Sequence, residues 1–240
     1  MGGRAAAPRG AVSRARRAET KLKKARKLLQ ALQSAEGQKD EVLVNAFLLE
    51  SELLIEHGKA TEASAVLSDG LARFADDANL LYARAMAGIK LKDVVQMEAD
   101  FRRMIELDPE NANAWNALGY SLLTETDRTE EAVNLIERAY QLEPSNGAIV
   151  DSLGWGFFKM GQLDQAISYL REAYKLTPEG EIAAHLAEAL SEMGAVDEAQ
   201  QLATEAKAKF PSSAPLLETI KRLKLQTDEL APPASHELRQ

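Results

Sequence analysis

The chain of 240 residues contains no cysteine. The sequence therefore predicts no disulfide scaffold, thiolate metal site, cysteine nucleophile or lipidated N-terminal cysteine. Histidine is scarce as well, because only His57, His185 and His236 occur, far apart in the sequence. None of them forms an H-E-x-x-H pattern, which would place two zinc ligands on one face of a helix. We therefore expect no metal ion or other cofactor.

Long hydrophobic runs are missing, and aromatic residues make up only 5% of the chain. The longest strictly apolar runs, such as Phe47-Leu48-Leu49, span a few residues, whereas about 18 are needed to cross a bilayer. The N-terminal segment also lacks the apolar core of about 7–15 residues that a secretory signal requires. From these residues alone we expect no membrane span and a cytoplasmic location.

Charge is distributed unevenly. Residues 1–28 carry ten Lys or Arg side chains against the single acid Glu19, whereas residues 29–240 carry 19 basic and 36 acidic side chains, a net charge of −17. The summed field of the larger part should repel polyanions. We therefore do not expect residues 29–240 to bind nucleic acid.

A period of about 34 residues runs through most of the sequence. Four prolines recur at spacings of 35, 34 and 33 residues, namely Pro109, Pro144, Pro178 and Pro211. Within one period, apolar residues return every three or four positions, as in 112–124 and 129–142, which is the pattern of two amphipathic helices. Each proline ends the second helix and is followed by a residue able to cap the next one. The sequence thus predicts an all-α solenoid of antiparallel helix pairs.

These residues resemble the tetratricopeptide repeat (TPR), which has a period of about 34 residues. The resemblance lies in Trp115-x-x-Leu118-Gly119 followed by Ala132, Ala139 and Pro144. It recurs after Leu153-Gly154 and, more weakly, after Leu186-Ala187. It implies a right-handed superhelix built from five repeats. We expect these repeats at 44–77, 78–111, 112–146, 147–179 and 180–211, within a region of 41–211.

The flanking segments are expected to differ from the repeats. Residues 1–13 should form a disordered basic arm and residues 14–40 a basic helix with a linker. Residues 212–226 read as a helix that caps the stack, because a terminal repeat needs a polar outer face. Residues 227–240 contain Pro232-Pro233 and few apolar residues, so we expect a mobile tail.

Residues 41–224 also resemble a narrower group, the C-terminal repeats of bacterial TPR lipoproteins from proteobacteria. This resemblance lies in the segments 116–120 (NALGY) and 151–155 (DSLGW). It implies a periplasmic scaffold held at the outer membrane and, for some members, an adaptor that brings substrates to a protease. The sequence departs from the group by lacking a signal peptide and a lipidated cysteine.

The first helix of each repeat lines the inner surface of such a solenoid, so it is the candidate binding face. Helical spacing puts polar and aromatic residues there, where they could anchor a peptide or protein partner. These candidates are Asn79, Tyr82, Met86, Asn113, Asn116, Tyr120, Asp151, Trp155 and Glu188. The alternative for Tyr120 and Trp155 is packing between repeats.

No catalytic motif is present outside the repeats, where G-x-x-x-x-G-K and G-x-S-x-G patterns are both absent. We therefore expect a scaffold or adaptor that is not an enzyme, with a protein or peptide partner and no small-molecule substrate. The alternative is a regulatory subunit of a larger enzyme assembly whose basic arm contacts an anionic partner. The sequence leaves the oligomeric state open.

Overall fold

The computed structural model describes residues 9–225, and within that range it contains twelve α-helices and no strand. The expected all-α fold is confirmed. The first five helices are α1 (Arg9–Gln33), α2 (Asp40–Glu56), α3 (Ala60–Arg73), α4 (Ala78–Leu91) and α5 (Val94–Leu107). They are followed by α6 (Ala112–Glu125), α7 (Thr129–Leu142), α8 (Gly147–Lys159), α9 (Leu163–Leu176), α10 (Gly180–Glu192), α11 (Val196–Lys209) and α12 (Ala214–Leu223).

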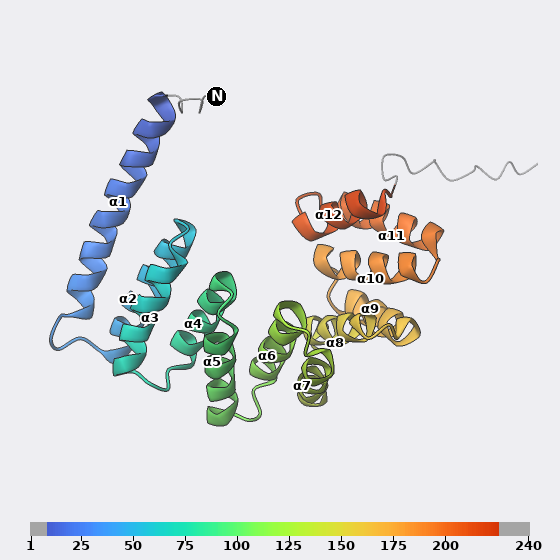
Figure 1. Ribbon diagram of the computed structural model, residues 1–240, viewed down its shortest axis with the longest axis horizontal. Helices are drawn as coiled ribbons and strands as arrows, with labels where there is room; N and C mark the ends of the chain where they lie inside the picture. The colour runs from blue at the N-terminus through green and yellow to red at the C-terminus, as the bar shows by residue number, and fades with distance from the viewer. Residues whose placement is uncertain (1–8, 226–240) are drawn as a thin grey trace, which may run out of the picture. The chain divides into compact units, whose positions relative to one another are not determined.

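The helices form antiparallel pairs, α2 with α3, α4 with α5, α6 with α7, α8 with α9, and α10 with α11 (Figure 1). The chain divides into two compact units at Pro109 and Glu110. In the first unit α3 also packs against α4, and in the second α7 packs against α8 and α9 against α10. Each unit is therefore a stack of helix pairs in which every pair contacts the next.

Small residues in the first helix of a pair allow the second helix to approach closely. A Cβ atom added to Gly119 of α6 would lie 2.6 Å from Ile136 Cγ1 and 2.8 Å from the Ala132 carbonyl oxygen, both in α7. The same addition to Gly154 of α8 would lie 2.7 Å from Leu170 Cγ of α9. The Leu-Gly pairs of the repeat thus mark the positions where two helix backbones are nearest.

The tight turn inside four of the five pairs, all except α6–α7, uses a left-handed backbone. Gly58, Gly161 and Gly194 supply it with φ angles of 71°, 74° and 87°. Lys92 occupies the corresponding turn between α4 and α5 with φ 59°. A non-glycine residue pays a steric penalty in this region. The α4–α5 turn therefore keeps the geometry of the repeat without its glycine.

The structure extends the N-terminal helix beyond the expected start, because α1 begins at Arg9 rather than at residue 14. Residues 9–13 of the segment expected to be disordered are thus helical, although Gly10, Val12 and Ser13 have low helix propensity. The rest of that arm and the expected tail at 227–240 lie outside the described residues.

The last helix packs on the pair before it. Leu216 and Ile220 of α12 are buried in a cluster with Ala183 and Ala184 of α10. The exposed side of α12 carries Lys221 and other polar residues. This arrangement covers the apolar edge of the preceding pair, which is the task of a terminal repeat.

Candidate functional site

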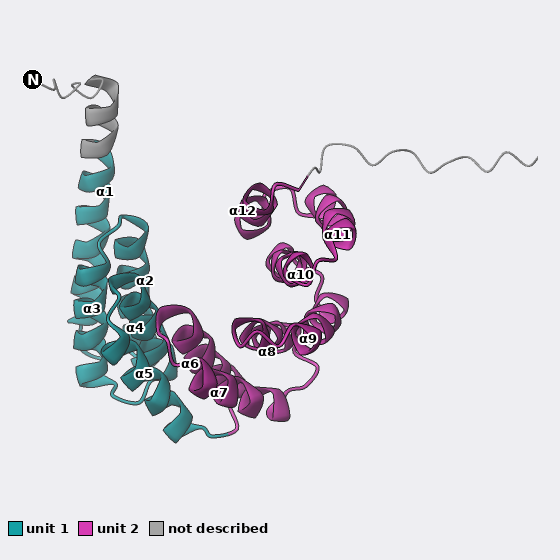
Figure 2. Ribbon diagram, turned by 45° about the vertical axis from the view of Figure 1, so that its right-hand side comes forward, with its two compact units in different colours: residues 1–109 teal, residues 110–240 magenta. Residues whose placement is uncertain are grey.

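The first helices of the pairs form one side of each unit. Figure 2 shows α6, α8, α10 and α12 following one another along the inner side of the second unit, with α7, α9 and α11 on the outer side. In the first unit α2 and α4 contact each other directly. The candidate binding residues belong to α4, α6, α8 and α10, so they lie on these helices.

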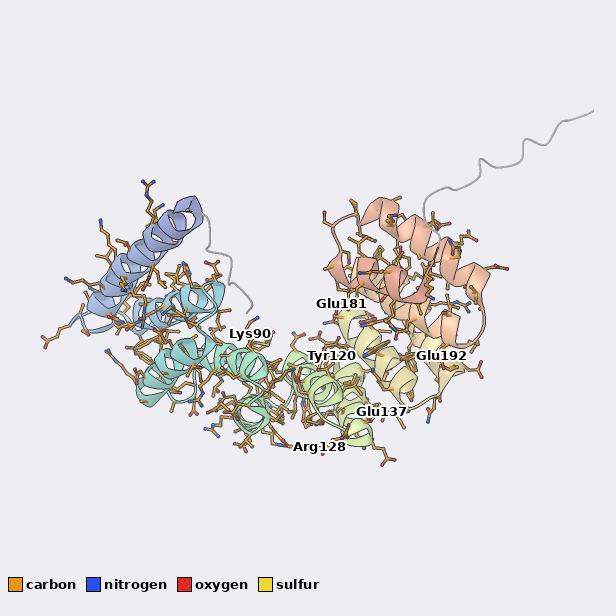
Figure 3. The ribbon with its side chains drawn as sticks, turned by 45° about the horizontal axis from the view of Figure 1, so that its top comes forward. Lys90, Tyr120, Arg128, Glu137, Glu181 and Glu192 are labelled. Atoms are coloured by element: carbon orange, nitrogen blue, oxygen red, sulfur yellow. The ribbon has the colours of Figure 1, made fainter. Side chains whose placement is uncertain are left out.

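The first unit contains an apolar groove between α2 and α4, with a volume of about 300 Å³. Two of the candidate residues line it with much of their side chains exposed, Tyr82 at 46% and Met86 at 38%. The Tyr82 ring rests edge-on against Phe101, with 5.9 Å between ring centroids. Lys90, labelled in Figure 3, and Glu52 also line the groove and bring charges of both signs to its wall. Its shape and lining suit an apolar side chain of a peptide.

The wall of this groove that belongs to α2 was not predicted. Leu48, Ser51 and Ile55 line it from α2, the first helix of the expected repeat at 44–77. That repeat lacks the motif residues that guided the choice of candidates in the later repeats. The signal that could have found them is the spacing of three, four and seven residues, which places all three on one helical face.

In the second unit, Trp155 lies within a stack of rings. Its centroid is 4.2 Å from that of His185 and 4.7 Å from that of Phe158, with interplanar angles of 18° and 14°. Lys159 Nζ lies 4.8 Å from the Trp155 ring centroid. Only 8% of Trp155 is exposed, so its packing contacts already cover most of the ring.

Asp151 lies one helical turn before Trp155 and is also buried, at 6% exposure. Its carboxylate accepts a hydrogen bond from His185 Nδ1, at 2.9 Å from Oδ2 and 3.0 Å from Oδ1. Sequence reasoning considered His185 only as a zinc ligand and missed this role. The repeats align Leu153-Gly154 with Leu186-Ala187, which matches Asp151 with Ala184, so the periodicity did not point to His185.

Tyr120 of α6 faces the same region. Burial is the main cause that raises the pKa of its hydroxyl above the ordinary value, followed by the negative charges of Glu181 and Asp151 and a hydrogen bond with the Glu181 side chain. Tyr120 and Glu181 are both labelled in Figure 3. The Glu181 charge on α10 thus acts on the Tyr120 hydroxyl of α6 and favours its neutral form.

The remaining candidates lie in three different settings. Asn79 and Asn113 are exposed on α4 and α6. Asn116 is half-buried, and its Oδ1 atom is buried without a hydrogen-bond donor among the described residues. Glu188 forms an ion pair with Arg222 of α12, in which Arg222 Nη1 donates to Glu188 Oε1 at 2.9 Å. Glu188 therefore holds the last helix in addition to facing the inner side.

Other kinds of site were also sought in residues 9–225. No group of three or more His, Cys, Asp or Glu side chains in this range could hold a metal ion. None of the helices described is both long and apolar enough to cross a membrane.

Comparison with known proteins identifies the repeat. Two tetratricopeptide repeat family models match, one over residues 157–223 and the other over residues 101–134. The chain is a tetratricopeptide repeat protein. It is 40% identical over 159 residues to a TPR repeat-containing protein of Pseudomonas aeruginosa, an alignment that covers 66% of this chain and 27% of that protein. The TPR chain thus spans about a quarter of the length of this relative.

Solved structures share the TPR fold. A thermophilic TPR protein of Thermus thermophilus has a TM-score of 0.66 and 21% identity, covering 76% of this chain and all of that one. The MamA protein of Desulfovibrio magneticus has a TM-score of 0.58 and 20% identity, covering 71% and 97%. The pilF protein of Pseudomonas aeruginosa has a TM-score of 0.58 and 18% identity, covering 78% and 93%. At these identities the likeness shows the fold alone.

Proposed function

We propose that this TPR protein is a non-catalytic scaffold that binds a peptide segment of a protein partner in the groove between α2 and α4. The observation that carries the proposal is the exposure of Tyr82 and Met86 inside an apolar groove. Tyrosine and methionine are enriched at protein interfaces relative to the rest of the surface. A groove of this size takes one or two apolar side chains of a peptide and leaves its polar backbone near Lys90 and Glu52.

The test is direct binding of peptides selected from a random display library against the full chain. Fluorescence anisotropy would give the dissociation constant of each peptide for the wild type and for Tyr82→Ala with Met86→Ala. The double variant should bind about tenfold more weakly or worse, because anchors at the centre of an interface dominate affinity. A matched control is Val95→Ala with Leu107→Ala, which removes two exposed apolar side chains of α5 outside the groove.

The proposal is wrong if the double variant binds as tightly as the wild type. It is also wrong if the control pair weakens binding equally. Circular dichroism and thermal unfolding should show both variants folded, since all four side chains are at least 38% exposed.

A more specific role, delivery of substrates to a protease, is proposed from the resemblance to TPR lipoproteins. One feature of the structure supports it. An adaptor needs two recognition surfaces, and this chain has the α2–α4 groove in one unit and an open groove lined by Glu179, Glu181 and Phe210 in the other. Simultaneous binding of a library peptide and a purified C-terminal-processing protease, measured by light scattering, would support the role. Competition between the two would contradict it.

A further inference from the structure

Helix α1 is attached to the first unit along one edge. Leu22 is buried at 5% exposure, and Arg26 bonds Glu50 of α2 through Nε at 2.9 Å and Glu62 of α3 through Nη1 at 2.6 Å. Gln30 Nε2 also donates to Glu50, at 2.8 Å. Because Glu50 is itself buried, these bonds fix the orientation of α1 on α2. The opposite edge of the helix is thereby held in a defined position.

That opposite edge lines an apolar groove between α1 and α2 with a volume of about 460 Å³. Ala25, Leu28 and Leu29 form the α1 side, while Leu49 and Leu53 belong to α2. Leu28 is 65% exposed and Leu49 is 50% exposed. Two leucines facing one open groove are costly to leave in water, at roughly 25 cal/mol for each Å² of apolar surface.

The position of the groove in the stack shows what would fill it. In the first unit α3 packs between α2 and α4, and in the second α7 packs between α6 and α8 and α9 between α8 and α10. Helix α1 packs chiefly against α2, and no helix of residues 9–225 lies in the place beside it where a second helix would pack. A helix lying in the groove would continue the packing already present in both units.

The two sides of the α1–α2 groove carry opposite charges. Helix α1 carries nine basic residues and one acid, whereas α2 carries five acids and no basic residue. On the α1 edge, Lys24 and Lys21 lie one and two turns before Leu28 on the same face. On the α2 edge, Glu52 and Glu56 line the groove itself. The groove is therefore bordered by a basic helix on one side and an acidic helix on the other.

We propose that this groove joins two copies of the chain, with the α1 edge of each copy seated against the α2 edge of the other. A two-fold interface is self-complementary, because both copies use the same patch and every contact between two different residues is repeated with the copies exchanged. Leu28 would then enter the second copy's groove beside Leu49. Lys24 would lie against the second copy's Glu52, and both contacts would occur twice.

Analytical ultracentrifugation of the full chain over a range of concentrations tests the proposal. The wild type should form a reversible dimer that weakens with added salt, because screening reduces exposed charge pairs. Leu28→Glu should raise the dimer dissociation constant by about tenfold or more, since it places a charge in the centre of an apolar contact. The matched control is Val95→Glu, whose side chain is 81% exposed on α5, and it should leave the dissociation constant unchanged.

Charge reversal separates this arrangement from other dimers. Lys24→Glu and Glu52→Lys should each weaken the dimer, and the two together should restore it, because the pair is then reformed with opposite signs. A wild type that stays monomeric at every concentration would overturn the proposal. So would a dimer that Leu28→Glu leaves intact, or a double reversal that fails to restore association.

Discussion

His185 Nδ1 lies 2.9 Å from Asp151 Oδ2, which joins α10 to α8 inside the second unit through side chains of two successive repeats. The imidazole is 12% exposed and the carboxylate 9% exposed. Because a carboxylate only accepts, Nδ1 carries the hydrogen and the Asp151 charge fixes the ring orientation. The ring so oriented stacks on Trp155. The inner face of this unit is thus a packed network and offers few free side chains.

The Asp151 carboxylate should contribute measurably to stability. Asp151→Ala leaves the imidazole without its acceptor, so we expect a loss of about 1–3 kcal/mol in the free energy of unfolding, measured in urea. Asp151→Ala combined with His185→Ala should cost less than the sum of the two single changes, because the two residues share one bond. Additive losses would show that the contact contributes nothing. Glu192→Ala, an exposed acid on α10, is the control and should stay within about 0.5 kcal/mol of the wild type.

Trp155 should behave as a packing residue. It is 8% exposed, and removal of a buried Trp typically costs about 3–5 kcal/mol, so Trp155→Ala should lower the melting temperature strongly. Tyr82→Ala removes an aromatic side chain that is 46% exposed and should cost much less. A Trp155→Ala variant that melts normally and loses peptide binding would instead make this ring a direct contact of the partner.

The raised pKa of Tyr120 predicts a loss of stability at high pH. The unfolded chain ionises this hydroxyl near its ordinary pKa of 10.0, whereas the folded chain keeps it neutral to higher pH. Above pH 10 the unfolded state therefore binds fewer protons than the folded state, and the free energy of unfolding falls as pH rises. Tyr120→Phe removes this contribution.

The measurement is urea unfolding between pH 8 and about 11.5, the range that brackets the ordinary tyrosine pKa. The free energy of unfolding of Tyr120→Phe should decline less steeply than that of the wild type. Tyr82→Phe, an exposed tyrosine of the other unit, should follow the wild type. Equal slopes for all three proteins would contradict the assignment.

Gly119 should not tolerate a methyl group. Gly119→Ala places a carbon 2.6 Å from Ile136 Cγ1 and 2.8 Å from a backbone oxygen, so the two helices must separate. Overpacking of this kind costs about 1–3 kcal/mol, against a gain of up to about 1 kcal/mol in helix propensity. Gly88→Ala is the matched control, because its nearest neighbour would lie at 3.2 Å. Thermal unfolding should show a larger loss of stability for Gly119→Ala than for Gly88→Ala. Equal losses would mean that α6 and α7 can accommodate a methyl group at this position.

The sequence alone determined the repeat, the all-α class and the helix pairs. The period of Pro109, Pro144, Pro178 and Pro211 and the small residues Gly119 and Gly154 are local signals, because proline ends a helix and a missing side chain permits close approach wherever they occur. The candidate face followed from the same local rule, since helical spacing decides which residues share a side. Tyr82 and Met86 were selected as candidates in this way, and both line a groove between α2 and α4.

Tertiary structure alone decided which of these residues are accessible. Tyr82 and Trp155 were assigned to equivalent faces, yet one is 46% exposed and the other 8%, because α10 places His185 over the Trp155 ring. The attachment of α1 depends likewise on Glu50, which accepts from Arg26, a residue 24 positions away. Burial depends on what neighbouring helices bring to a position, and sequence periodicity describes only one helix at a time.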